Sequence, residues 1–384
     1  MMNRREFMHL TGAVAMAGAV PDIAMAAAQA HQPRILVLVE LKGGNDGFNT
    51  LIPYEDDNYY KHRPKIGIRK EHLIPLENGM GMNAALKPLK PFWDRGQMAW
   101  IQGVGYPQGV LSHFHSMDIW ETAAMRGDST TGWLARVVPR FKKGLHGIAI
   151  SADQNALGPL AGSQLNSICM QSPRSFLSHA RFIQEVPLNR QTAALAHVTK
   201  TQHQLVDAGK QIVESLQNPK GRVQVRLSKG GLGHGLKSAA EMIVSGLDAP
   251  VYKVTQDGFD THIGQKGPQE NALYQLGHGL ASFAQTMQQA GLWDRVLVMT
   301  YSEFGRRIVE NKGQGTDHGT ASAQLVMGGR VNRGIFGRHP NLGRLDRNDN
   351  VAHTTDFRQM YATVANRWWG QPNPWNGHRV LPFV

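Results

Sequence analysis

The sequence predicts an α/β fold, in which a doubly wound, mostly parallel β-sheet carries helices on both faces. Short apolar runs rich in β-branched residues alternate with longer amphipathic segments at least four times along the chain, which is typical of repeated strand–helix units. Clusters of polar residues follow the apolar runs, as expected at the carboxyl ends of parallel strands. Because no shift in composition divides the 384 residues, we expect a single domain over residues 31–384.

The predicted strands are short apolar runs bounded by glycine or polar residues. They span residues 34–41, 98–104, 147–151, 251–255, 296–301 and 323–327. The predicted helices have apolar residues at helical spacing. They span residues 86–95, 113–124, 191–216, 234–246, 271–290 and 356–369. We expect an irregular loop over residues 152–189.

The amino terminus predicts export. Residues 3–8 (NRREFM) have the twin-arginine pattern, and small-residue cleavage triplets follow at 24–26 and 28–30. The alternatives are an ordinary amphipathic start and a membrane anchor, but for an anchor the apolar stretch 9–20 is shorter than the roughly 20 residues that span a bilayer. We therefore expect a twin-arginine signal peptide over residues 1–30, with the twin-arginine translocase as a partner. The mature chain should be periplasmic or secreted, without a membrane span.

Composition narrows the class of partner. The formal net charge is +12, yet no basic run or arginine-rich helix concentrates it, so nucleic acid is not an expected ligand. The chain has one cysteine, Cys169, which excludes an internal disulfide.

The most informative stretch follows the apolar run 296–301. Ser302, Glu303 and Arg306 come directly after it, and a glycine-punctuated loop then leads to Asp317 and His318. Carboxylates, arginine and imidazole at the carboxyl end of a buried strand predict a site for a metal ion, an anion or both. A small anionic substrate is therefore an expected ligand.

Candidate metal ligands also lie in the loops that follow two other predicted strands. Asp46 lies in a glycine-rich loop after residues 34–41. Asp257, Asp260 and His262 follow residues 251–255, and a carboxylate and an imidazole two residues apart can share one cation. For each aspartate the alternative is a turn residue that hydrogen-bonds its own backbone.

Ser112 precedes a predicted helix and is suited to its N-cap. A helix amino terminus favours phosphate or sulfate, and a serine there can act as a nucleophile beside a metal ion. A plain helix cap is the alternative. His113 and His115 diverge on a helix, so at most one of them should face the site.

Six motifs in this order resemble an uncharacterised family of twin-arginine-exported bacterial proteins, domain of unknown function 1501. They are 43–47 (GGNDG), 112–114 (SHF), 132–136 (GWLAR), 258–262 (GFDTH), 302–306 (SEFGR) and 315–319 (GTDHG). That family is in turn similar to the alkaline phosphatase and sulfatase superfamily. The resemblance implies an alkaline-phosphatase-like fold and places the site at the strand ends.

The superfamily pattern also implies roles for single residues. By this resemblance Ser112 is the nucleophile, and the metal ligands are Asp46, Asp260, His262, Glu303 and His318. Phe304 stands where the superfamily has a ligating histidine and cannot bind a metal ion. The resemblance therefore implies a reduced site, in which Asp317 is a substitute ligand and Arg306 binds the anionic substrate. His113, Asp257 and Ser302 are candidates for supporting these residues.

Three functions follow from these patterns. The first is an exported metal-dependent hydrolase or transferase acting on a phosphate or sulfate ester, with a divalent ion that is Zn, Mn, Ca or Mg. The second is a non-catalytic periplasmic binding or assembly protein that retains the fold. The third is a metal-free serine hydrolase, which the absence of a G-x-S-x-G motif disfavours.

Overall fold

The main sheet is organised around β1 (Ile35–Leu41), in which every residue is buried. The computed structural model describes residues 34–126, 129–151, 153, 156–180, 193–217, 219, 221 and 230–384. Six of the seven residues of β1 are Ile, Leu or Val, which suit a strand with both faces covered. β1 pairs in parallel with β8 on one side and with β9 on the other.

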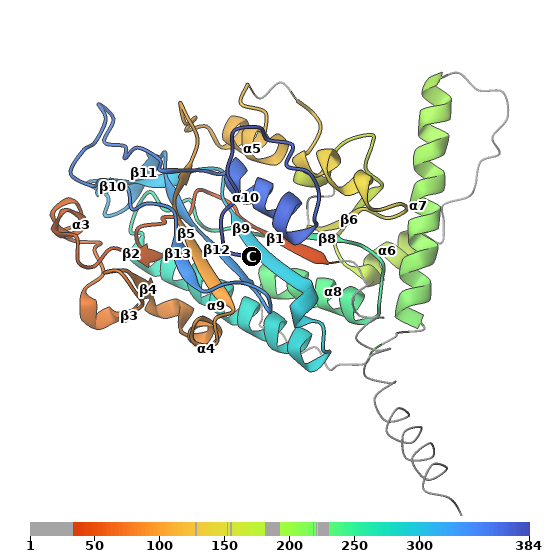
Figure 1. Ribbon diagram of the computed structural model, residues 1–384, viewed down its shortest axis with the longest axis horizontal. Helices are drawn as coiled ribbons and strands as arrows, with labels where there is room; N and C mark the ends of the chain where they lie inside the picture. The colour runs from red at the N-terminus through yellow and green to blue at the C-terminus, as the bar shows by residue number, and fades with distance from the viewer. Residues whose placement is uncertain are drawn as a thin grey trace, which may run out of the picture. The chain divides into compact units, whose positions relative to one another are not determined.

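The nine-stranded sheet has the order β13-β5-β12-β9-β1-β8-β6-β7, and β14 pairs with β5 (Figure 1). Its other strands are β5 (Met98–Gly105), β6 (Gly147–Ile150), β7 (Ser167–Met170), β8 (Val251–Gln256), β9 (Val296–Tyr301), β12 (Ser322–Gly328), β13 (Gly334–Phe336) and β14 (Thr355–Asp356). Within this sheet, as far as the structure describes it, only β12 runs against β1. The predicted mostly parallel sheet is confirmed.

The reversal of β12 follows from the segment before it. A parallel connection needs a crossover that returns the chain to the other end of the sheet. Residues 302–321 instead form a hairpin, β10 (Gly305–Glu310) with β11 (Thr316–Gly319), beyond the end of β9. The chain therefore enters β12 at the edge where β9 ended, and β12 pairs with β9 in the antiparallel direction.

Helices cover both faces of the sheet (Figure 1). They include α5 (His113–Thr122), α8 (Gly231–Val244), α9 (Lys266–Gln289) and α10 (Arg358–Thr363). Val37 of β1 belongs to the core formed with α8 and α9, whereas its neighbour Leu38 belongs to the core formed with α5 and α10. This alternation is the consequence of the two-residue period of a strand. The doubly wound arrangement is confirmed.

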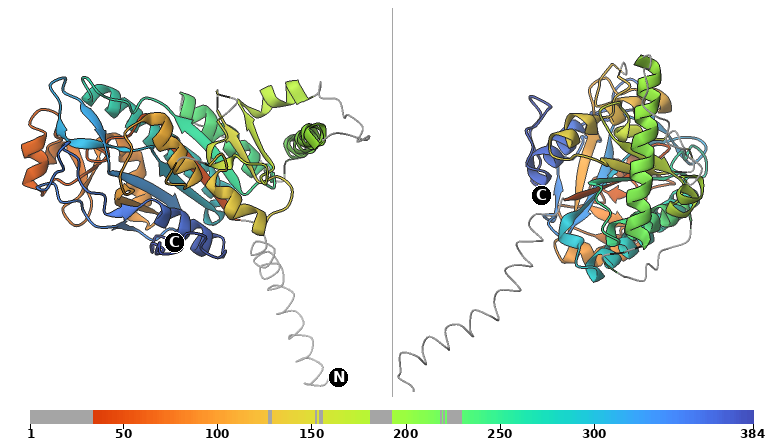
Figure 2. Two further views of the ribbon diagram at one scale, coloured as in Figure 1. Left: turned by 90° about the horizontal axis from the view of Figure 1, so that it is seen from above. Right: turned by 90° about the vertical axis from the view of Figure 1, so that its right-hand side faces the viewer.

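Smaller elements surround the sheet. They are α3 (Asp57–His62), α4 (Lys90–Asp94), α6 (Pro173–Ala180), α7 (Ala193–Gln217) and the three-stranded sheet of β2 (Leu51–Ile52), β4 (Gly81–Asn83) and β3 (Leu73–Pro75). Figures 1 and 2 show α7 outside the sheet on the side of β6 and β7. A 3₁₀ turn, Ala84–Leu89, leads into α4.

One sequence-based expectation is wrong, and one pairing was not predicted. Residues 152–189 are not an irregular loop throughout, because they include β7 and α6. The predicted glycine-punctuated loop before Asp317 is the turn of the β10–β11 hairpin; the hairpin itself was not predicted, and it places Asp317 and His318 on a strand. In both places glycines and polar residues outnumber the apolar residues that signal a strand, and pairing with neighbours decides the structure.

Contacts divide the chain into two units, Met1–Arg34 and Ile35–Val384. The expected signal peptide over residues 1–30 lies outside the described residues. Within the described part of the chain, no helix combines the length and the hydropathy needed to cross a membrane.

Candidate metal centre

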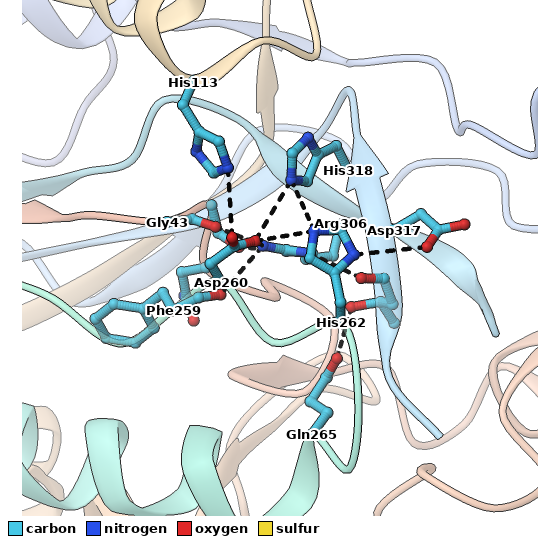
Figure 3. Close-up of polar contacts among 12 residues, drawn as sticks. Gly43, His113, Phe259, Asp260, His262, Gln265, Arg306, Asp317 and His318 are labelled. Atoms are coloured by element: carbon cyan, nitrogen blue, oxygen red, sulfur yellow. Dashed lines mark hydrogen bonds and ion pairs between the residues drawn. The ribbon is translucent and has the colours of Figure 1, made fainter. Parts of the chain in front are cut away.

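Two imidazoles and one carboxylate meet beyond the carboxyl ends of the central strands (Figure 3). Asp260 and His262 lie in the loop after β8, and His318 lies on β11. The Nε2 atoms of His262 and His318 are 3.0 Å apart, and the Asp260 Oδ1 atom lies 3.0 Å from the first and 3.4 Å from the second. These separations are close to the roughly 3.3 Å expected between ligand atoms around a tetrahedral zinc ion.

His113, the first residue of α5, approaches the same carboxylate from the other side. Its Nε2 atom is 3.5 Å from Asp260 Oδ2. The ligand atoms of His113, Asp260 and His318 all lie within 4.8 Å of one another. Asp260 and His318 thus belong to two overlapping groups, one completed by His262 and the other by His113. We call these four residues the His–Asp cluster.

In each of the three imidazoles, the Nδ1 atom, on the side away from Asp260, faces an oxygen atom. His318 donates from Nδ1 to the Leu111 carbonyl oxygen at 2.7 Å, which leaves an unprotonated Nε2 facing Asp260. The Nδ1 atom of His113 lies 2.9 Å from Glu303 Oε1, and that of His262 lies 3.6 Å from Asp317 Oδ1. Oxygen partners at Nδ1 orient histidines that bind metal ions through Nε2.

The surroundings favour the protonation states that bind a metal ion. Burial raises the pKa of Asp260, but the hydrogen bond and positive charge of Arg306 outweigh it and hold the pKa below its usual value. Burial lowers the pKa of His318, only partly offset by its bond to the Leu111 carbonyl. At neutral pH Asp260 is therefore ionised and His318 neutral.

Arg306 lies beneath the cluster and is fully buried. It donates to the carbonyl oxygens of Gly43 at 2.5 Å, Gly44 at 2.8 Å and Thr316 at 2.8 Å, and it forms an ion pair with Asp260. The guanidinium thus ties three loops together and has no surface open to a ligand. The prediction that Arg306 binds the anionic substrate conflicts with this arrangement, so we reassign it to positioning Asp260.

Asp46 is not brought into the cluster. It forms a bidentate ion pair with Arg63, at 2.6 and 3.0 Å, and both side chains are fully buried. Gln265 and the backbone N–H of Phe48 donate to the same carboxylate. Both carboxylate oxygens of Asp46 accept hydrogen bonds from protein donors. This is the environment of an aspartate that stabilises the fold, not of one whose oxygens are free to bind a metal ion.

The other predicted residues lie around the cluster at different depths. Ser112 is the exposed N-cap of α5, and its side chain makes no capping hydrogen bond. Glu303 is buried, accepts from the Gly43 N–H at 2.8 Å and contacts His113. Ser302 is fully buried and donates to the Leu41 carbonyl oxygen. Asp257 is exposed and lies 3.9 Å from Lys42.

Phe304 occupies the middle of this arrangement although it cannot bind a metal ion. Its ring centroid is 4.9 Å from that of His113 and 4.3 Å from that of His318. Gly44, at φ +78°, leaves room for this ring, because a Cβ atom there would collide with it. The ring therefore packs against two imidazoles from separate elements and holds them near Asp260.

Sequence reasoning gave His113 only a supporting role and did not identify Arg63 or Gln265. The motif 112–114 (SHF) contained the signal for His113, but its approach to Asp260 depends on where α5 lies over the sheet. Arg63 and Gln265 stand in no motif and acquire their roles only through contacts across 17 and 219 residues.

Several solved structures resemble this chain. The C-terminal periplasmic domain of EptC from Escherichia coli is 11% identical, with a TM-score of 0.43, over 91% of this chain and 84% of that one. A protein in the alkaline phosphatase superfamily from Vibrio parahaemolyticus is 11% identical, with a TM-score of 0.43, over 89% and 68%. The phosphonate monoester hydrolase from Silicibacter pomeroyi is 10% identical, with a TM-score of 0.38, over 91% and 76%.

The family is indicated by the sequence of the carboxyl-terminal part. Residues 238–381 match the model of the family described as "Protein of unknown function (DUF1501)", and over these residues the resemblance inferred from the motifs is confirmed. No curated protein matches the chain.

Proposed function

We propose that this protein is an exported, metal-dependent hydrolase or transferase that acts on a phosphate or sulfate ester with a reduced metal centre. The observation that supports the proposal is the His–Asp cluster, in which imidazole Nε2 atoms from three separate segments surround one ionised carboxylate. Export rests on the twin-arginine pattern at residues 3–8.

The donor set fits a divalent ion. Asp260 and His318 would hold it, together with His262, His113 or both, since their ligand atoms are already spaced for a common ion. A site rich in imidazole favours zinc and similar transition metals over calcium and magnesium, which prefer oxygen ligands. When bound, such an ion would supply Lewis acidity and lower the pKa of a coordinated hydroxyl group or water.

The rest of the site would bind and attack the ester. The first turn of α5 presents backbone N–H groups and the positive end of the helix dipole beside the cluster, which favours a phosphate or sulfate group. Ser112 is the N-cap at that end and is an exposed residue. As nucleophile, Ser112 Oγ would form a bond to phosphorus or sulfur while the alcohol leaves. Water or an acceptor hydroxyl would then release the group from the serine.

Metal analysis of the purified mature protein tests the cluster. We expect near-stoichiometric metal in the wild type and a loss of most of it in His318→Ala. Comparing His262→Ala with His113→Ala then shows which group completes the site. His115→Ala is the matched control, because His115 is exposed on the same helix and outside the cluster. A wild type without metal that gains no thermal stability on metal addition would contradict the proposal.

Turnover distinguishes this function from a second one. Phe304, in the position where a ligand is expected, favours a non-catalytic binding or assembly protein that retains the fold. An enzyme should cleave an aryl phosphate or sulfate ester, and Ser112→Ala should abolish the cleavage without loss of metal. Bound metal without activity on any ester class would favour the binding protein.

A further inference from the structure

A large cleft lies apart from the His–Asp cluster residues. It has a volume of about 870 Å³ and is bordered by the segment 64–74, by the turn around Ala84 and by the first residues of α9. That volume is typical of sites for small molecules, which occupy roughly 300–1,000 Å³.

Positive charge dominates the lining. Lys65, Arg69, Lys87 and Lys266 contribute four exposed cations from three separate segments. None of the four forms an ion pair with another described residue at 4.0 Å or less. Two carboxylates, Glu71 and Glu270, also line the cleft and leave an excess of two positive charges. Cations that line one cleft without carboxylate partners make its potential positive, which favours a bound anion.

The start of α9 adds to this potential. Lys266 is the first residue of that 24-residue helix, and Gln265 before it makes no side-chain capping bond. The Gln265 side chain instead bonds to Asp46 and accepts from Thr316. Pro268 has no N–H group and that of Gln269 bonds to the Gln265 carbonyl oxygen, so only the N–H groups of Lys266 and Gly267 can contribute to an anion site at this helix amino terminus.

The remaining lining limits the kind of anion. Ile68 and Ile74, both half-buried, offer apolar surface for an uncharged body between anionic groups. No Phe, Tyr or Trp side chain is among the described residues that line the cleft, and His72 is its single aromatic ring, so it lacks the row of platforms on which single-stranded nucleic acids stack. Its pocket-like size also differs from an extended nucleic-acid groove.

We propose that this cleft is a binding site for a small polyanion carrying two or more phosphate or sulfate groups. The site is distinct from the His–Asp cluster in its residues, and its ligand is held by lysine and arginine rather than by a metal ion. Since His262 precedes Lys266 by only four residues, ligand in the cleft lies beside the segment that carries the cluster.

Isothermal titration calorimetry of the mature protein tests the cleft. The probes are tripolyphosphate and sucrose octasulfate, which separate phosphate from sulfate as the preferred group, with sucrose as the neutral control. We expect at least one polyanion to bind and sucrose not to bind. Raising the ionic strength from about 0.05 to about 0.5 M should weaken the binding, because both partners are exposed to solvent.

Charge reversal assigns the binding to the cleft. Lys87→Glu/Lys266→Glu should weaken it about tenfold or more. The matched control Lys143→Glu/Arg379→Glu changes the net charge equally at exposed positions outside the cleft, and its affinity should stay within about twofold of the wild type.

The His262→Ala variant tests whether polyanion binding in the cleft is independent of the metal centre. This variant should bind the polyanion as the wild type does, even if the proposed catalytic function is refuted. Absence of binding by the wild type, equal affinity of both double variants, or loss of binding in His262→Ala would each overturn the assignment.

Discussion

Asp46→Asn distinguishes a structural aspartate from a metal ligand. The family resemblance implies that Asp46 binds metal, whereas the structure pairs it with Arg63 in a fully buried, bidentate contact. If Asp46 is structural, its loss leaves the Arg63 guanidinium without a counter-charge in the core. We therefore expect lower stability with unchanged metal content.

The size of the effect follows from the burial of the pair. Removing one partner of a buried ion pair costs about 3–5 kcal/mol. For a unit the size of Ile35–Val384, this corresponds to a decrease in Tm of about 4–7 °C. In Asp46→Asn/Arg63→Met the unpaired charge is gone, so the double variant should lose less stability than the two single variants added together.

Differential scanning calorimetry measures the Tm, and metal analysis of the same samples measures the metal content. Asp257→Asn is the control, because Asp257 is exposed and its Lys42 contact is long, so its Tm should stay near the wild type. The reasoning is refuted if Asp46→Asn retains the wild-type Tm, or if it loses its metal while remaining equally stable.

Two further predictions concern stability. Burial raises the pKa of Glu121 to about 7 despite nearby Lys253, so the folded state holds a proton that the unfolded state releases near pH 4.5. This contribution to stability is lost as the pH rises from about 5 to 7, and the Tm advantage of Glu121→Gln over the wild type should grow across that window. A constant difference would contradict it. Gly44→Ala should cost about 2 kcal/mol or more in chemical denaturation, because of its positive φ and the collision with Phe304. Gly231→Ala, where a Cβ atom meets nothing within 4 Å, should instead change the stability by less than about 0.5 kcal/mol, and equal effects would refute the distinction.

The class of fold follows from local patterns in the sequence. Strands such as β1 and β9 are continuous apolar runs, and a strand buried on both faces requires such a run wherever it lies in the sheet. The positions of Asp260 and His262 after a strand were equally local, because each belongs to the loop that directly leaves β8. Patterns of this kind depend on a few neighbouring residues and can be read without the fold.

The contacts of each polar side chain, in contrast, depend on how the chain folds. Asp46 and Asp260 both follow strands near glycine, yet one is paired with buried Arg63 and the other is surrounded by imidazoles. Arginine side chains are usually exposed, but backbone carbonyl oxygens from converging loops enclose that of Arg306. Asp46 and Arg63 are 17 residues apart in the sequence and Arg306 and Gly43 are 263 apart, and no local pattern predicts such contacts. Their geometry exists only once the sheet has brought the loop ends to one edge.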